Sequence, residues 1–180
     1  AWGSAEPDSG DLLSTMKIVR SAAELGGASR TCLAIGFFDG VHLGHQQIVR
    51  QTIQDARRYD AVSLVITFDA HPNTVVAPDR VPPLIYSLPQ KLRAIEAQGV
   101  EVALLIHFDQ AFSEQTGETF IRGLRRDLGP VHSVCVGANF MFGRQNVYRI
   151  KPFCLLRRFG LGQGRPKIDA PGHHVPKRDM

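Results

Sequence analysis

Four short apolar runs, separated by segments with helical periodicity, limit the folds open to this chain more than any other feature. The runs span residues 31–37, 62–68, 101–107 and 131–136, and each has the length of one buried strand. Helices are predicted between them, over residues 43–59, 88–98 and 113–128. The second and third helices are followed by Gly99 and Gly129, and glycine commonly ends a helix. The proline-rich residues 70–87 are predicted to be mostly loop.

Strands that alternate with helices predict a parallel sheet covered on both faces and joined by right-handed crossovers. We therefore expect an α/β fold with a doubly wound, Rossmann-like parallel sheet. Ligands of such sheets bind beyond the carboxyl ends of the strands. Functional residues are accordingly sought just after the first, second and fourth apolar runs.

The 180 residues suit a single folded domain with short additions at both ends. Residues 1–15 are rich in Gly, Ser, Asp and Glu without periodicity, which predicts a disordered leader. Residues 16–159 are predicted to form the domain. Residues 160–180 carry four glycines and three prolines but few large apolar side chains, so we expect an atypical, basic and poorly ordered tail.

Composition excludes several classes of protein. No apolar run reaches the roughly 18–20 residues that span a bilayer, and no signal-peptide pattern is present. The net charge is +4, concentrated after residue 144, but no aromatic interleaving accompanies the basic residues. The three cysteines are far apart and form no CxxC pair, which argues against a zinc–thiolate site. We expect a soluble, cytoplasmic protein with no membrane or nucleic-acid partner, and leave protein partners open.

Three polar segments follow the predicted strands. Residues 36–45 read G-F-F-D-G-V-H-L-G-H, residues 67–72 read T-F-D-A-H-P, and residues 137–144 read G-A-N-F-M-F-G-R. Because the carboxyl ends of parallel strands share one edge of the sheet, the three segments are expected to converge on one cleft.

His42 and His45 are the first candidates for chemistry. They lie at the start of a predicted helix with Gly44 between them. A helix N-terminus offers free N–H groups and the positive end of the helix dipole, both of which favour phosphate. Glycine lets a ligand approach the backbone, and imidazoles can donate hydrogen bonds to charge on a transferring phosphoryl group.

Simpler interpretations of these residues remain open from the sequence. Histidines at this spacing are often surface or capping residues, and His71 could join them as a third zinc ligand. Asp39 could only stabilise its turn, and Asp69 with His71 could form an ordinary Asx turn before Pro72.

The three segments in this order resemble the FAD synthetase (FMN adenylyltransferase) module of bacterial bifunctional riboflavin kinase/FAD synthetases, within the HxGH nucleotidyltransferase superfamily. The likeness runs from residue 16 to residue 144, and residues 90–92, 99–100 and 108–124 also fit it. The resemblance implies the nucleotidyltransferase variant of the Rossmann-like fold. It also implies the transfer of AMP from ATP to FMN, which gives FAD and pyrophosphate with the help of Mg²⁺.

The resemblance also implies roles for individual residues. His42 and His45 would be the catalytic pair in contact with the ATP phosphates. Residues 69–72 would lie against the nucleotide, and Asn139 would contact a ligand. The full set of implied ligand contacts is Gly36, Phe38, Asp39, Gly40, Gly44, Asp69, His71, Pro72, Asn139, Phe140, Gly143 and Arg144.

The sequence departs from the family pattern at several places. Phe37 stands where a small polar residue is usual, and Ala70 replaces a usual proline. The basic, glycine-containing loop expected after Gly143 is replaced by R-Q-N-V-Y-R. A later Ser-Ser-Thr-x-x-Arg-type segment, which helps to bind ATP phosphates in the family, has no counterpart in residues 162–180, and neither has the riboflavin kinase barrel.

These departures leave three hypotheses. The first is an FMN adenylyltransferase, and the second is another HxGH nucleotidyltransferase. The third is an inactive, nucleotide- or flavin-binding remnant. The missing segment predicts that this chain makes family-like ligand contacts with little or no turnover.

Overall fold

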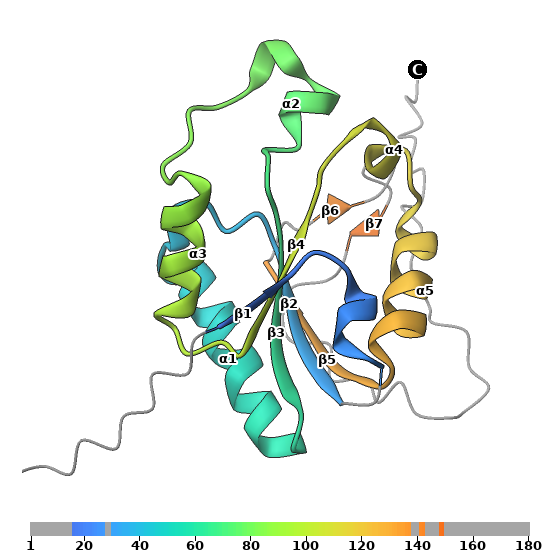
Figure 1. Cartoon of the computed structure of the whole chain (residues 1–180). Helices are drawn as coiled ribbons and strands as arrows, with labels where there is room; N and C mark the ends of the chain where they lie inside the picture. Colours follow the sequence, from blue (N-terminus) through green and yellow to red (C-terminus); the bar gives the residue numbers. More distant parts are fainter. Residues whose placement is uncertain (1–15, 28–29, 138–140, 143–147, 150–180) are drawn as a thin grey trace, which may run out of the picture.

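The computed structural model describes residues 16–27, 30–137, 141–142 and 148–149. In these residues a five-stranded, fully parallel sheet has the strand order β1-β4-β3-β2-β5 (Figure 1). The predicted doubly wound parallel sheet is thereby confirmed. The strands are β1 (Lys17–Val19), β2 (Thr31–Ile35), β3 (Val62–Phe68), β4 (Val102–Ile106) and β5 (Val131–Val136). A separate antiparallel pair joins β6 (Met141–Phe142) to β7 (Tyr148–Arg149).

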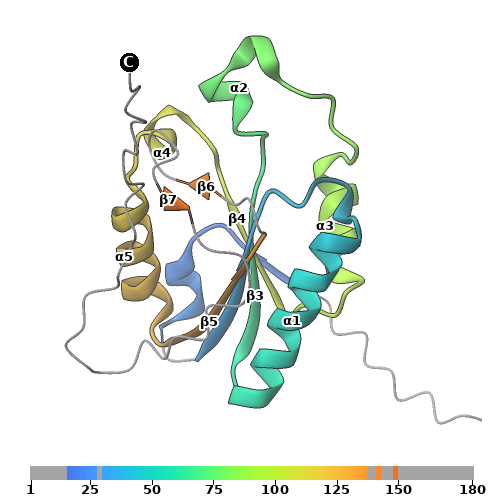
Figure 2. The ribbon, with the colours of Figure 1, turned by 180° about the vertical axis from the view of Figure 1, so that it is seen from behind.

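Helices cover both faces of the sheet, as Figures 1 and 2 show from opposite sides. One face packs against α1 (Leu43–Tyr59) and α3 (Leu88–Glu96), and the other against α5 (Gly117–Leu128) and the 3₁₀ turn η1 (Ala22–Leu25). Short elements complete the described chain: η2 (Asp39–Val41), α2 (Asn73–Val76), η3 (Pro78–Arg80) and α4 (Gln110–Ser113).

Three differences from the sequence prediction concern single elements. The strand β1 was not predicted, because its three residues form no apolar run. The helix expected over residues 113–128 begins later, as α5, because Thr116 caps it by accepting a hydrogen bond from the Thr119 amide at 3.2 Å, and the short helix α4 ends at Ser113. Residues 70–87, predicted to be mostly loop, contain the single turns α2 and η3.

The two faces of the sheet carry side chains of different size. Large residues such as Leu33, Ile35 and Ile66 point to the α5 face and are at most 1% exposed. On the face toward α1 and α3, the central strands present smaller ones, including Ala34 and Ala103, which are fully buried. Alternation along each strand produces this division, and short side chains let α1 and α3 lie close to the sheet.

The predicted leader (residues 1–15) and tail (residues 160–180) lie outside the described residues. Among the helices that the structure describes, none combines the length and apolar character required to cross a membrane.

Candidate active site

The loop after β2 has a constrained backbone. Phe38, Gly40 and Val41 have positive φ angles of 55°, 69° and 38°. Positive φ is costly for residues with a Cβ and persists where surrounding contacts hold it. Phe38 supplies such contacts, because its side chain is 1% exposed in the core beneath α1. A Cβ on Gly36 would lie only 3.0 Å from the Phe38 ring, so glycine at position 36 makes room for this anchor.

The loop leads directly into the N-terminus of α1. His42 is the N-cap residue, but its side chain makes no capping hydrogen bond, and the first turn of the helix contains no acidic residue. The first amide groups of a helix lack partners within the helix. As far as the described residues show, the positive end of α1 can receive an anion, and phosphate binding there stays a prediction.

The two histidines of this terminus lie against each other. The ring centroids of His42 and His45 are 3.6 Å apart with 25° between the ring planes. Burial, followed by the neighbouring His42, lowers the pKa of His45 to about 4, although Asp39 partly offsets this shift. His45 is therefore neutral at pH 7. Its Nδ1 is buried and has no hydrogen-bond partner among the described residues, so a ligand atom could supply that partner.

Asp39 connects the loop after β2 to the segment before α3. Its two carboxylate oxygens accept hydrogen bonds from the backbone amides of Ile85 and Tyr86, each at 2.9 Å. Burial alone would raise the pKa of Asp39, but hydrogen bonds from the amides of Ile85, Tyr86 and Gly40 lower it below its ordinary value. Asp39 therefore stays ionised at neutral pH and links two loops, a wider role than stabilising its own turn.

The loop after β3 divides its polar side chains between two directions. Asp69 contacts the segment after β4, where His107 Nδ1 lies 2.6 Å from Oδ2 and the Phe108 amide donates to Oδ1 at 3.1 Å. His71 Nδ1 accepts a hydrogen bond from the Asn73 amide at 3.0 Å, which leaves Nε2 to carry the proton of the neutral ring. The side chain of Asp69 thus reaches across to the segment after the neighbouring strand, while His71 makes a local hydrogen bond two residues along the chain. Pro72 is the N-cap residue of α2.

The first two predicted loops do lie together. The Phe37 ring meets the His71 ring edge-on, with 4.9 Å between centroids. The Thr67 hydroxyl also donates to the Phe37 carbonyl at 3.0 Å. The third predicted loop carries Asn139, Phe140, Gly143 and Arg144, which lie outside the described residues, so its convergence on the cleft stays a prediction.

Lys91 is a site residue that the sequence analysis did not single out. It lies on the inner side of α3, where its side chain is 3% exposed, and its Nζ donates to the Phe68 carbonyl at 2.6 Å. Burial lowers the pKa of Lys91 to about 8, while the carboxylates of Asp39 and Asp69 partly offset the shift. The available signal was a lysine placed four residues before Ile95, in register with the buried side of a predicted helix.

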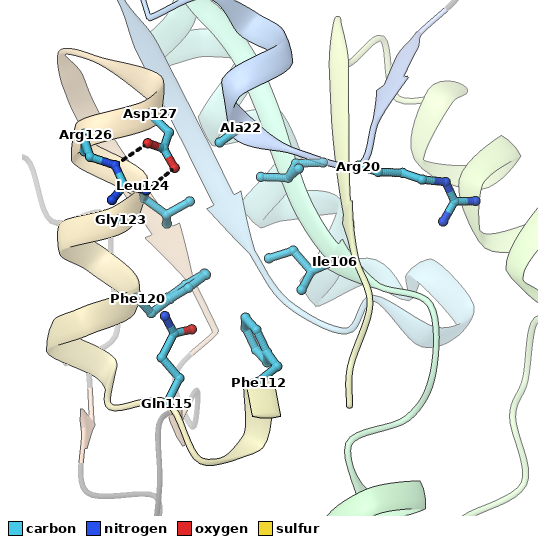
Figure 3. A pocket seen from close by; sticks show the side chains of 11 residues that line it. Arg20, Ala22, Ile106, Phe112, Gln115, Phe120, Gly123, Leu124, Arg126 and Asp127 are labelled. Atoms are coloured by element: carbon cyan, nitrogen blue, oxygen red, sulfur yellow. Dashed lines mark hydrogen bonds and ion pairs between the residues drawn. The ribbon is translucent and has the colours of Figure 1, made fainter. Parts of the chain in front are cut away.

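An aromatic group lies beyond the end of β3. Phe68, Phe108 and Phe112 contact one another with ring centroids 5.5–5.8 Å apart, and Phe120 contacts Phe112 at 5.5 Å. Phe112 and Phe120 line a pocket of about 220 Å³ between β4 and α5 (Figure 3). The figure shows these two rings and Ile106 facing a common space, while the Arg20 guanidinium points away from it.

The sequence left open a zinc site formed by His42, His45 and His71. Within the residues that the structure describes, no three His, Cys, Asp or Glu side chains are grouped closely enough to hold a metal ion. His42, His45 and His71 therefore do not form the zinc site considered from the sequence.

The family model and the similar proteins with known names indicate the same family. The family model for FAD synthetase matches residues 27–160. Proteins named bifunctional riboflavin kinase/FMN adenylyltransferase are similar in Escherichia coli strain K12 (32% identity over 83% of this chain), Bacillus subtilis strain 168 (34% over 64%) and Haemophilus influenzae (30% over 71%). The chain covers 47%, 37% and 42% of these relatives, so it spans less than half the length of each.

A solved structure shows the same fold. The crystal structure of a macrolide-efflux protein from Streptococcus pneumoniae superposes with a TM-score of 0.60 over 71% of this chain and 43% of that one. At 23% identity this likeness concerns the fold alone. The family model, by contrast, covers most of the sequence and includes both described loops of the site. The chain belongs to the FAD synthetase family.

Proposed function

We propose that this chain is an FMN adenylyltransferase, which transfers AMP from ATP to FMN to give FAD and pyrophosphate. The observation that carries the proposal is the open N-terminus of α1, where His42 and His45 are stacked and no acidic side chain lies in the first turn. Membership of the FAD synthetase family and the names of its relatives support the choice of FMN and ATP. Because the proposed substrates are ATP and FMN, we also propose a cytoplasmic location. No nucleic-acid partner is proposed.

The proposed chemistry needs no covalent intermediate. A phosphate oxygen of FMN attacks the α-phosphorus of ATP, a new P–O bond forms, and the bond to pyrophosphate breaks in line with it. Such transfers depend mainly on positioning and charge neutralisation. The amides at the start of α1 and the ring of His42 would hold the phosphates. His45 is neutral in the free protein, and the phosphate charge would raise its pKa and strengthen it as a donor.

Mg²⁺ belongs to the proposal as a companion of ATP. When bound, this ion would supply positive charge that offsets the negative charge of the phosphates. Because no group of three metal-binding side chains occurs in the described part of the chain, the ion would be held largely by the triphosphate. Asp39 is the carboxylate on the loop after β2, which leads into α1, but both of its oxygens already accept backbone hydrogen bonds. An outer position, through water, fits Asp39 better than direct coordination.

The flavin ring of FMN would use the aromatic pocket. A flat ring system is suited to packing against aromatic side chains. Phe112 and Phe120 supply this surface, and Phe68 connects it to the loop that carries His71. The flavin and the nucleotide would then approach each other across the carboxyl ends of β2, β3 and β4.

One sequence observation favours a second candidate. The basic, glycine-containing loop of the family pattern after Gly143 is replaced by R-Q-N-V-Y-R, which is compatible with a protein that binds ATP or FMN without turnover. The same assay separates the two. The purified chain is incubated with FMN, ATP and Mg²⁺, and products are resolved by chromatography, while calorimetry measures ATP binding.

FAD formation that depends on His42 and His45 supports the adenylyltransferase. Conversion of each histidine to alanine is compared with His132→Ala, because His132 stacks on Tyr59 at the other end of α1. ATP binding without FAD would identify the binding protein instead. Transfer of a nucleotide from CTP to another phosphate, with no FAD, would indicate a different member of the superfamily.

A further inference from the structure

Lys91 is a buried cation without a role in the mechanism above. Its side chain is 3% exposed and points inward from α3 together with that of Ile95. Lysine is almost never buried without a partner, because an ammonium loses its hydration there. Lys91 has two partners in the described structure. Its Nζ donates to the Phe68 carbonyl at 2.6 Å and lies 4.1 Å from the centroid of the Phe37 ring.

Both partners stand at the base of a site loop. Phe37 lies two residues before Asp39, and Phe68 immediately precedes Asp69. The Phe37 ring also meets the ring of His71 edge-on, at 78° and 4.9 Å. The ammonium of Lys91 therefore contacts the loop after β2 and the loop after β3, and it reaches His71 through one aromatic ring.

Lys91 also interacts electrostatically with charged and titratable residues of the same two loops. The carboxylates of Asp39 and Asp69 favour its charged form. Burial lowers the pKa of His71, and the charge of Lys91 lowers it further against the opposing effect of Asp39. His71 is thereby kept neutral beside a fixed cation, with Nδ1 accepting the Asn73 amide and the proton on Nε2.

We propose that Lys91 is a positioning residue for the adenylyl transfer, which holds the loops after β2 and β3 in register through the Phe37 ring and the Phe68 carbonyl. The proposal rests on the proposed function. The aromatic part of this link belongs to Phe37. Lys91 acts on His71 and on the loop after β2 without touching the reacting atoms.

The central variant is Lys91→Met, which keeps an unbranched side chain and removes the charge. Lys17→Met is the matched control, because Lys17 is exposed on the edge strand β1. For Lys91→Met we expect kcat for FAD formation to fall about 10- to 100-fold, as misplaced catalytic loops typically cause. KM for ATP should change less, and the Tm should stay equal or rise because a buried charge is gone. Lys17→Met should leave kcat and KM unchanged.

A second measurement does not depend on turnover. The pKa of His71, followed by NMR in the free protein, should rise in Lys91→Met and stay unchanged in Lys17→Met. Phe37→Leu keeps an apolar side chain but removes the ring face under the ammonium of Lys91. This variant should therefore change the pKa of His71 and lower kcat about 3- to 10-fold. This variant also tests the idea if Lys91→Met fails to fold.

The outcomes separate the two proposals. Wild-type kcat and KM in Lys91→Met would overturn the positioning role, and so would an unchanged pKa of His71 in both Lys91→Met and Phe37→Leu. If the wild-type protein forms no FAD, the proposed function fails. The His71 titration then decides whether Lys91 holds the two loops in register.

Discussion

Replacing Gly44 by alanine should separate stability from nucleotide binding. A Cβ at this position would lie 3.3 Å from Cε1 and 3.4 Å from Nδ1 of His42, closer than most Cβ contacts. The His42 ring would have to shift by a few tenths of an ångström within its stack on His45, and the methyl group would stand where the proposed phosphate approaches the backbone. Loss of one oriented donor and partial blocking of the helix terminus should weaken ATP binding by about 1.5 kcal/mol, roughly tenfold.

The same change should not destabilise the fold. Gly44 lies in the first turn of α1 without a positive φ, and alanine in a helix is about 0.5–1 kcal/mol more favourable than glycine. Gly123→Ala in α5 is the matched control, because a Cβ there meets no atom within 4 Å. Calorimetric titration with ATP and urea unfolding should show similar stability gains in both variants but weaker binding only in Gly44→Ala. Equal ATP affinity in the two variants would refute the placement of phosphate at this helix terminus.

Two further predictions concern the loop contacts. Asp39→Asn should lose about 1–2 kcal/mol in free energy of unfolding, measured by urea titration, because the amide group cannot accept both the Ile85 and Tyr86 N–H groups. A loss no larger than that of Asp79→Asn, on an exposed 3₁₀ turn, would contradict this reasoning. The Asp69–His107 pair should stabilise the protein at mildly acidic pH, since the pKa of His107 is raised, mainly by its hydrogen bond to Asp69, and that of Asp69 is lowered. The contribution of this pair to the free energy of unfolding is present below the unfolded pKa of histidine and is lost as the pH rises through the raised pKa of His107. It is also lost at strongly acidic pH, where Asp69 becomes protonated. His107→Gln should therefore lower the Tm more at about pH 5.5 than at about pH 8.5, and a pH-independent effect would argue against the ion pair.

The sheet and the position of the loop after β2 could be predicted because their signals are local. The apolar runs mark β2 through β5, and the helical spacing after residue 43 gave α1 the bounds Leu43–Tyr59 that the structure shows. The position of His42 and His45 at the start of α1 followed from the same local pattern.

Other features depend on contacts between distant residues and could not be predicted this way. The strand β1 is recognisable only by its pairing with β4, in which Ile18 lies opposite Ala103. The contact between Asp69 and His107 depends on the register of β3 and β4. Lys91 resembles an ordinary surface lysine until the ends of β2 and β3 are placed beneath α3.

The small side chains on the sheet face covered by α1 and α3 have a consequence for how mutations would act at a distance. Ala34 and Ala103 are fully buried on the face that carries α1 and α3, so a larger residue there has no free volume to occupy. A larger residue at Ala34, on β2 beneath α1, would lift α1 from the sheet, and the histidine pair at the first turn of α1 would be displaced with it. Variants that impair the site should therefore be found among alanines of the core as well as among polar residues of the cleft. Enlarged side chains at Leu33 or Ile66 would instead press on the face that α5 covers, on the side of the pocket proposed for the flavin.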